Sequence, residues 1–519
     1  MLPEYCSASV MGKHAAEGRQ TNRRFSLRHL ATSIFSFPVV CVFFLSGFIF
    51  RFCKLQFAEP DIWWHLRNAR YVLQYHSFPR VDTYSFGAAG SPWLAHEWLS
   101  EIVYYLGFKI MGLQGIFVVY FLLIVLIYAG VYYRACRAGA DCKDATLVAC
   151  LGILAGGVSI GPRMLLFGWL CMVGLLLILD HFQRTAKGLW LLPPLFIIWI
   201  NLHGSWVFGM AVILLTIASG FLEGQWGKVQ AHRWSHPELR SLLIAGGASV
   251  AGLFVNPFGY HLPLYPFDLL FRQTSNLKHI DEWQPVDFSS KQGWLALILI
   301  LALLAAAWFA GHRWKLSEIM LAAFAIWFAL SHVRLLFFAG IILPSLLAPC
   351  LQVFTPYDRS IDKPWLNAAV MASLAGALFY FFPTQAYLGD KVRAVYPEAA
   401  IEFMQRQQIQ GRIFNDYGWG GYMEWTAPDL KPFIDGRADI FVYNRTFDEY
   451  DEVAAAKRPL EILNKYRFDY VLFNPDTPLG YLLDHSKEWR SMYSDKTAVL
   501  YQHVPAVAIS SNGSQPASN

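Results

Sequence analysis

The chain has 519 residues, of which 55% are hydrophobic and only 15% are charged, and its mean hydropathy is +0.34. This composition excludes a soluble globular protein. The net charge of +5 is small and spread along the chain, so nothing in it supports a nucleic-acid partner. The sequence therefore predicts an integral membrane protein.

The N-terminal segment 1–30 is basic and runs into the first long apolar stretch. No small-residue cleavage site follows that stretch, so we expect a cytoplasmic tail before a membrane anchor and not a removed signal. The eight cysteines are scattered, none follows Cys350, and no CxxC pair occurs. Neither a disulfide framework nor a cysteine metal site is predicted.

Apolar runs recur at lengths near the ~20 residues that cross a ~30 Å hydrocarbon core. Basic residues recur in every second connecting loop, as the positive-inside rule expects. We predict a transmembrane domain over 31–383 with about eleven spans, which leaves 384–519 outside. These spans lie near 31–52, 113–133, 145–160, 164–180, 188–201, 205–222, 241–256, 293–310, 316–331, 335–352 and 365–383. Runs 188–201 and 205–222 are alternatively one long broken helix.

The first external loop, 53–112, opens with the stretch Glu59–Arg70. From Asp61 onward the spacing is helical and puts Asp61, His65 and Asn68 on one side. Paired tryptophans favour a position at the membrane surface. A short helix there would present an acid and an imidazole together. The alternative is an amphipathic anchor whose charges only face headgroups, with Asp61 as a helix cap.

Polar residues also interrupt apolar runs at their external ends. They are Arg163, His203 within Asn201–Trp206, and His332 and Arg334. A central Arg or Asp costs about 2.5–3.5 kcal/mol on insertion scales, so such residues indicate function. The guanidinium fork matches phosphate oxygens, which predicts a lipid phosphate at this surface. The alternative for each Arg, taken singly, is that its side chain only extends to the lipid headgroups.

The C-terminal region is richer in charge and has shorter apolar runs. Short strands are predicted at 412–416, 432–435, 470–473 and 498–502, between helices such as 397–408 and 459–466. This alternation predicts a small external α/β domain over 384–507, followed by a disordered Ser/Asn/Pro-rich tail over 508–519.

Two stretches of this region carry aromatic and charged residues. Asn415–Tyr422 is a glycine-rich turn with aromatics, which suits stacking on a sugar or a peptide, and Phe433–Asp439 places two acids and an Arg at a strand end. The alternative for both is a buried turn with ion pairs. The chain has no GxGxxG after a strand, Walker loop, HExxH or GxSxG.

Several motifs together carry a resemblance. They are Asp61–Arg67, Ala95–Leu99, Asn201–Gly204, Asn256–Gly259, His332–Arg334, Asn415–Tyr422 and Ile434–Asp439. With them the chain resembles a group of little-characterised prokaryotic membrane proteins. That group is similar in layout to the C-type (GT-C) glycosyltransferase superfamily, which uses polyprenyl-phosphate-linked sugars.

The stretch Glu59–Arg67 is similar to the Asp-Pro-aromatic stretch in oligosaccharyltransferase catalytic subunits. The likeness implies that Asp61, or alternatively Glu59, is the catalytic acid. From their positions in the sequence we expect His65 to act beside it, and we expect Arg163, His203, His332 and Arg334 to bind the donor phosphate. The likeness also implies that Asn415–Gly418, with Asp416 and Tyr417, reads the acceptor. From the aromatic turn and the charged strand end we expect Trp419, Asp435 and Arg437 to bind the acceptor as well. The paired Trp of the acceptor motif is absent, so an Asn sequon is not implied. Protein O-mannosyltransferases and lipid A aminoarabinose transferases share the layout, which leaves the acceptor open among a glycan, a lipid and a protein.

The residue types suit glycosyl transfer, which needs a base near the acceptor and a cation near the leaving phosphate. Asp61 and Glu97 would suit Mg or Mn, although two or three acids do not establish a metal. We expect a glycosyltransferase of the cell envelope, in the inner (plasma) membrane and in contact with its lipid. It would move a sugar from a polyprenyl-phosphate donor to an acceptor at the outer face.

A second class remains open, namely a transporter or flippase of lipid-linked sugars, or a degenerate scaffold of the same layout. The broken segment Asn201–Trp206 would also serve a transporter. Transporters, however, cluster their charges at the midplane and seldom need an external domain of this size.

Overall fold

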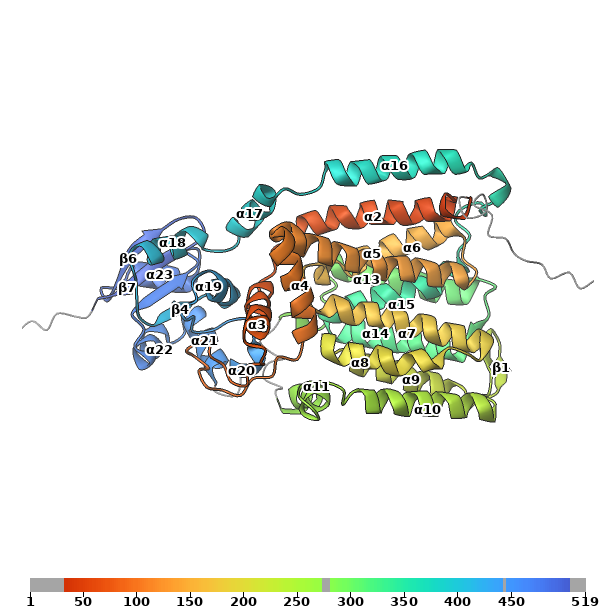
Figure 1. Ribbon diagram of the computed structural model, residues 1–519, viewed down its shortest axis with the longest axis horizontal. Helices are drawn as coiled ribbons and strands as arrows, with labels where there is room; N and C mark the ends of the chain where they lie inside the picture. Colours follow the sequence, from red (N-terminus) through yellow and green to blue (C-terminus); the bar gives the residue numbers. More distant parts are fainter. Residues whose placement is uncertain (1–31, 273–280, 442–444, 505–519) are drawn as a thin grey trace, which may run out of the picture.

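The computed structural model describes residues 32–272, 281–441 and 445–504. It consists of a helical body and a smaller α/β region, with short helices between them (Figure 1). The predicted N-terminal tail and the predicted disordered tail lie outside the described residues.

The helices of the body follow the predicted apolar runs. They are α2 (Phe37–Leu55), α5 (Leu113–Arg137), α6 (Cys142–Ala155), α7 (Leu165–Thr185), α8 (Leu192–Leu202), α9 (Trp206–Ser219), α10 (His236–Gly252), α13 (Lys291–Phe309), α14 (Leu316–Ser331), α15 (Leu336–Leu347) and α16 (Pro364–Tyr380). Helices α8 and α9 are separate, because the chain leaves helical geometry at His203.

Five helices of the described chain are long and apolar enough to cross a membrane. The number rises to six if α16 and α17 (Gln385–Arg393), bent by 56°, form one span. Leu189–Leu202, Trp206–Ser219 and Leu316–Ser331 are apolar but shorter. The chain is thus a membrane protein, and the predicted count of eleven spans is not confirmed.

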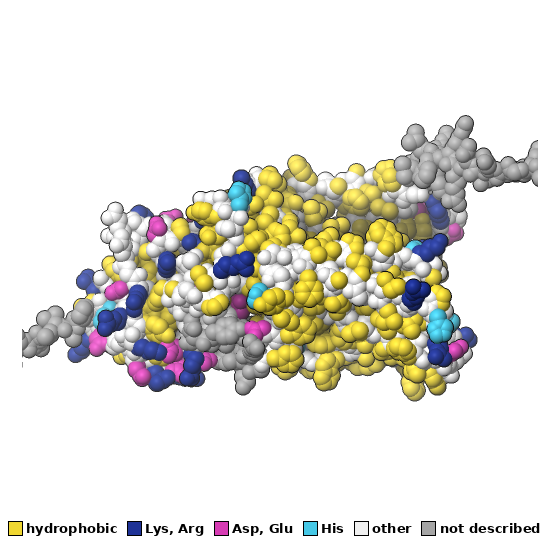
Figure 2. All heavy atoms as spheres, turned by 60° about the horizontal axis from the view of Figure 1, so that its bottom comes forward, with side chains coloured by type: hydrophobic (Ala, Val, Ile, Leu, Met, Phe, Trp, Pro, Cys, Tyr) yellow, Lys and Arg dark blue, Asp and Glu magenta, His cyan; other side chains and the backbone are white. Residues whose placement is uncertain are grey.

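Glycines allow a close contact between the backbones of α6 and α15. A Cβ atom on Gly152 would lie 2.5 Å from the carbonyl oxygen of Gly340, so these two backbones touch. Large aromatic side chains such as Trp169, Trp199 and Phe337 fill the neighbouring interior. The face of the body seen in Figure 2 is largely apolar, as expected where lipid and not water surrounds the helices.

Three short helices lie at the end of the body that faces the α/β region. Helices α3 (Ile62–Tyr75) and α4 (Trp98–Met111) come from the loop 53–112, which was predicted to be external, and α11 (His261–Arg272) follows α10. Helix α3 begins after Asp61, and Pro60 keeps it from extending back, because a proline disfavours helical geometry at the residue before it, Glu59. The predicted short helix that carries His65 and Asn68 is therefore present.

The α/β region is built on a four-stranded sheet in the order β4-β5-β7-β6. The strands are β4 (Ile413–Asn415), β5 (Tyr470–Phe473), β6 (Trp489–Ser494) and β7 (Val499–His503). Only β4 and β5 are parallel. The predicted strand at 432–435 is reduced to a single bridge between Pro432 and Ile413, and β6 was not predicted.

Helices surround this sheet. They are α18 (Glu398–Arg406), α19 (Gly420–Thr426), α20 (Ala438–Phe441), α21 (Thr446–Ala454), α22 (Pro459–Tyr466) and α23 (Pro478–Asp484). A second, small sheet of β1 (Gly224–Trp226), β2 (Val229–Ala231) and β3 (Trp314–Lys315) lies at the far end of the helical body.

Candidate functional site

The carboxylate of Asp61 lies at the junction of the helical body and the α/β region. It makes no capping hydrogen bond to the backbone of α3. Instead, Trp64 donates its indole N–H to Asp61 Oδ1 at 3.2 Å, one turn along the helix. The capping role that sequence reasoning left open for Asp61 is therefore absent.

The surroundings of Asp61 bring its pKa to the neutral range. Burial and then the neighbouring Glu59 charge raise the pKa of Asp61 to about 7, against the lowering effects of Trp64, Arg163 and Arg334. A carboxyl group that exchanges a proton near neutral pH can act as a general base.

A row of ion pairs between acidic and basic side chains lies beside Asp61. Arg163 Nε is 2.7 Å from Glu59 Oε2, and the Nη1 atom of the same guanidinium is 2.5 Å from Glu282 Oε1. Arg334 Nη1 lies 3.9 Å from the other oxygen of Glu282. These acids raise the pKa of Arg163, so it stays charged although it is mostly buried. Arg334 is less tightly held.

The remaining side of Arg334 meets aromatic side chains. Its guanidinium lies 5.6 Å from the ring of Trp283, and the imidazole of His332 packs edge-on against the same ring. The Nδ1 atom of His332 is 2.7 Å from the carbonyl oxygen of Trp283. The predicted residues Arg163, His332 and Arg334 are thus brought to one place, close to Asp61.

A second polar network joins α3, α4 and the α8–α9 connection. Glu101 Oε1 lies 2.9 Å from His65 Nδ1, and Glu101 Oε2 accepts from the Asn68 amide at 2.5 Å. His65 and Asn68 therefore share a face of α3, as the spacing predicted. Glu97 is shared by two imidazoles, 3.6 Å from His65 Nε2 and 3.0 Å from His203 Nε2.

Burial decides the protonation states in this network. It lowers the pKa of His65 to about 3 and raises the pKa of Glu101 to about 8, so Glu101 donates to a neutral imidazole at neutral pH. His203 accepts the Ser205 backbone N–H at Nδ1, which leaves its Nε2–H to donate to Glu97. Both oxygens of Glu97 thus face imidazoles.

Metal binding has no ready-made ligand set in the described part of the chain. No group of three or more His, Cys, Asp or Glu side chains there could hold a metal ion. Glu97 contacts histidines, whereas Asp61 is bonded to Trp64. The predicted pairing of Asp61 and Glu97 around Mg or Mn stays untested, and these donors do not fit it.

The α/β region closes against Asp61. Gly436 touches the Asp61 carboxylate, and Tyr417 donates its hydroxyl to the Gly436 carbonyl at 3.2 Å. The ring of Trp63 packs against the rings of Tyr396 and Tyr422 in the α/β region, with centroid distances of 5.7 and 5.0 Å. The region therefore forms one wall of the site.

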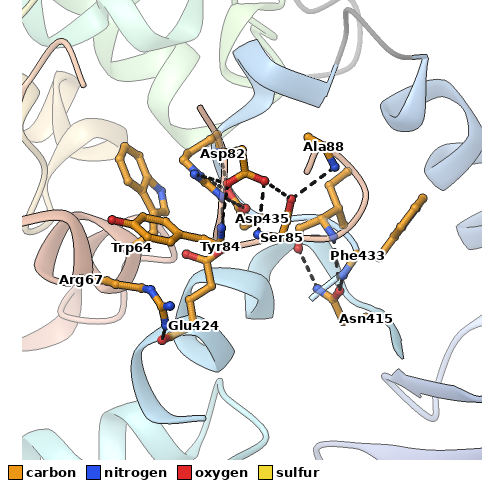
Figure 3. Close-up of polar contacts among 12 residues, drawn as sticks. Trp64, Arg67, Asp82, Tyr84, Ser85, Ala88, Asn415, Glu424, Phe433 and Asp435 are labelled. Carbon is orange, nitrogen blue, oxygen red and sulfur yellow. Dashed lines mark hydrogen bonds and ion pairs between the residues drawn. The ribbon is translucent and has the colours of Figure 1, made fainter. Parts of the chain in front are cut away.

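A buried ion cluster fixes this wall (Figure 3). Arg437 pairs with Asp435 at 2.6 Å, Asp82 at 2.8 Å and Glu424 at 3.2 Å, and all four side chains are fully buried. Burial raises the pKa of Glu424. Burial also acts to raise the pKa of Asp435, but the Arg437 charge and the hydrogen bonds from Arg437 and Glu424 together lower it. Because Asp82 belongs to the loop 53–112, the cluster ties that loop to the α/β region.

The residues that the resemblance assigned to the acceptor are mostly engaged inside the protein. Asp435 and Arg437 belong to the buried cluster, and Trp419 donates its indole N–H to the Val395 carbonyl at 3.0 Å. Asp416 accepts from the backbone N–H of Gly418 at 2.8 Å, as in the buried turn that sequence reasoning left as the alternative. Acceptor binding by these residues stays a prediction, and their placement does not favour it.

Three residues of the junction were not predicted as site residues. Glu282 is the partner of both arginines, Glu101 is the partner of His65, and Gly436 contacts Asp61. Both acids do stand in motifs rich in charge and tryptophan, which was the available signal.

No family model and no curated protein matches this chain. Among solved structures, the chain is similar to the oligosaccharyltransferase AglB from Archaeoglobus fulgidus in complex with an inhibitory peptide and a dolichol-phosphate. The identity is 11%, covering 89% of this chain and 74% of that chain, with a TM-score of 0.48. It is also similar to ArnT from Cupriavidus metallidurans bound to undecaprenyl phosphate, at 14% identity over 92% of this chain and 98% of that chain, with a TM-score of 0.48. Both identities are low, so the likeness concerns the fold alone.

Proposed function

We propose that this protein is a membrane glycosyltransferase that moves a sugar from a polyprenyl-phosphate-linked donor to an acceptor at the membrane surface. The observation that carries the proposal is the Asp61 carboxyl group, which titrates near neutral pH beside two arginines. The donor class comes from the motifs that this sequence shares with polyprenyl-phosphate-dependent transferases.

In this mechanism Asp61 is the general base. It takes the proton of an acceptor hydroxyl or amide while the acceptor atom bonds to the anomeric carbon of the sugar. The bond between that carbon and the phosphate oxygen breaks, and the lipid phosphate leaves with the electron pair. A base with a pKa of about 7 is well matched to this task at neutral pH.

The leaving phosphate needs a cation that is free to bind it. Arg163 is held by Glu59 and Glu282 at 2.7 and 2.5 Å, whereas the contact between Arg334 and Glu282 is 3.9 Å long. We therefore assign phosphate binding to Arg334, with His332 beside it, and positioning of Glu59 and Glu282 to Arg163. Arginine suits this role because its fork pairs with two phosphate oxygens.

The location of the charges favours the enzyme over the transporter. Asp61, Arg163 and Arg334 lie at one end of the helical body, before α3, before α7 and after α14. A transporter site is expected near the midplane, between broken helices. In the proposed orientation this end and the α/β region face the outside, and the basic loops face the cytoplasm.

A transfer assay tests the proposal. Membranes containing the protein are incubated with radiolabelled polyprenyl-phosphate sugars, and label is followed into the glycan, lipid and protein fractions. We expect label in one fraction, and a rate at least ~10-fold lower for Arg334→Gln, with Arg359→Gln as a control on an exposed arginine elsewhere. Movement of intact donor across the bilayer without transfer would instead identify a flippase.

A further inference from the structure

A cavity of about 210 Å³ lies at the end of the helical body remote from Asp61. The last turns of α5 and α7, the segment before α14 and the end of α15 enclose it. Helix α7 connects the two ends, because Arg163 lies just before its first residue and Arg184 in its last turn. At 1.5 Å per residue its 21 residues span about 30 Å, the thickness of a hydrocarbon core. The cavity is therefore at the opposite membrane surface.

Cationic side chains dominate the lining of this cavity. The basic residues are Arg134, Arg137, Arg184, His312, Arg313 and Lys315, and the acids are Asp180 and Glu318. Both acids are already engaged. Asp180 pairs with Arg134 at 2.7 Å, and Glu318 lies 3.9 Å from His312 and accepts the Lys315 backbone N–H at 2.9 Å. Figure 2 shows basic side chains gathered at this end of the body.

Four cations of the lining have no carboxylate partner among the residues that the structure describes, namely Arg137, Arg184, Arg313 and Lys315. Arg184 donates to the carbonyls of Asp180 and Arg137 at 3.1 and 2.9 Å, and Lys315 donates to the Gln183 amide oxygen at 3.3 Å. Positive charges that converge on one hollow without counter-ions repel one another and attract an anion.

Helix dipoles do not account for all of these charges. Arg137 and Arg184 stand at the C-terminal ends of α5 and α7, where a cation is favourable. Arg313 and Lys315, in contrast, immediately precede α14, and a cation near a helix N-terminus is unfavourable. The positive-inside rule accounts for the side of the membrane on which they lie but not for their convergence on one cavity, which a bound anion explains.

We propose that this cavity binds a phosphate group. Guanidinium forks and a lysine ammonium are the usual protein ligands of phosphate. Pockets for drug-sized molecules measure about 300–1,000 Å³, so a cavity of about 210 Å³ suits a smaller group, such as a lipid headgroup or a small soluble phosphate. The site is separate from the donor phosphate proposed above and lies on the other side of the membrane.

Binding to the purified full-length protein in neutral detergent tests this proposal. The probes are phosphatidylglycerol, inorganic phosphate and, as a zwitterionic control, phosphatidylcholine, and the readouts are native mass spectrometry and the midpoint of thermal unfolding. The test variant is Arg313→Gln combined with Lys315→Gln. The control is Lys187→Gln, an exposed lysine on the same side of the body that does not line the cavity.

We expect saturable binding of phosphatidylglycerol or phosphate, at least ~10-fold weaker in the double variant and unchanged in Lys187→Gln. Binding of the lipid without competition by inorganic phosphate identifies a headgroup, and competition identifies a site open to soluble phosphates. Equal binding by wild type and double variant, or an equal loss in the control, overturns the proposal. Should the double variant not fold, Arg137→Gln provides the same comparison.

Discussion

Gly436 lies against the carboxylate of Asp61 so closely that a Cβ atom added to it would be 1.8 Å from Oδ1. No side chain fits in this space unless one of the two elements moves. The contact joins the loop between α19 and α20 to the start of α3. The position of the proposed base is therefore set by the α/β region.

Replacing Gly436 with Ala should push Asp61 out of position. A displacement of about 1 Å at a reacting group can cost about 10²-fold in rate, so we expect sugar transfer to fall at least ~10-fold while the protein still folds. Gly389→Ala is the matched control, because only the flexible end of Arg393 lies near that position, at 3.4 Å. Normal transfer by Gly436→Ala would contradict the role of this contact.

The charges next to Asp61 should shift the pH dependence of transfer in opposite directions. A base works when deprotonated, so the rate should rise with pH through the Asp61 pKa of about 7. Glu59 raises this pKa and Arg163 lowers it. In pH profiles of kcat/KM, Glu59→Gln should move the midpoint to lower pH and Arg163→Gln to higher pH. Shifts in the same direction, or none, would argue against Asp61 as the titrating group.

Removing Arg437 should destabilise the protein strongly. The change leaves Asp82, Asp435 and Glu424 buried without their cation, and breaking a buried ion pair costs about 3–5 kcal/mol. Thermal unfolding in detergent should show a large decrease in midpoint for Arg437→Gln and little change for Arg445→Gln, whose side chain is 84% exposed. Equal midpoints would mean that the cluster does not hold the wall in place.

Cysteine labelling tests the proposed orientation. In a cysteine-free background, Asp476→Cys in the α/β region should react with an impermeant maleimide in intact cells, because both the position and the region are exposed. Lys187→Cys, at the other end of the body, should react only after lysis. The reverse pattern would place the α/β region inside.

Much of the junction could be predicted, because polar residues beside apolar runs are costly and therefore conspicuous. Asp61, His65, Arg163, His203 and Arg334 were found in this way, and the structure brings them together. Their partners were harder to find. Glu282 lies in a loop far along the chain, and nothing local indicates that it faces Arg163.

Arg437 was expected to bind the acceptor, but it lies in a buried ion cluster. A sequence cannot distinguish an arginine that binds a ligand from one that holds three acids in a core, because both occur in turns rich in charge. Asp82, whose ion pair shows that Arg437 is part of a core cluster, lies 355 residues earlier in the chain. The predicted number of spans was also too uncertain from the sequence, because apolar runs do not show helix length. Helices α8, α9 and α14 are apolar but shorter than a membrane crossing.

The substitution Asp61→Asn tests the central claim most directly. Asparagine keeps the oxygen that accepts from Trp64 and nearly the same volume, so the variant should fold with an unchanged unfolding midpoint. It cannot take a proton, so transfer of radiolabelled sugar from the polyprenyl-phosphate donor should fall by ~10²-fold or more, while the exposed control Asp476→Asn remains active. If Asp61→Asn folds and transfers sugar at the wild-type rate, Asp61 is not the base and the proposed site is wrong.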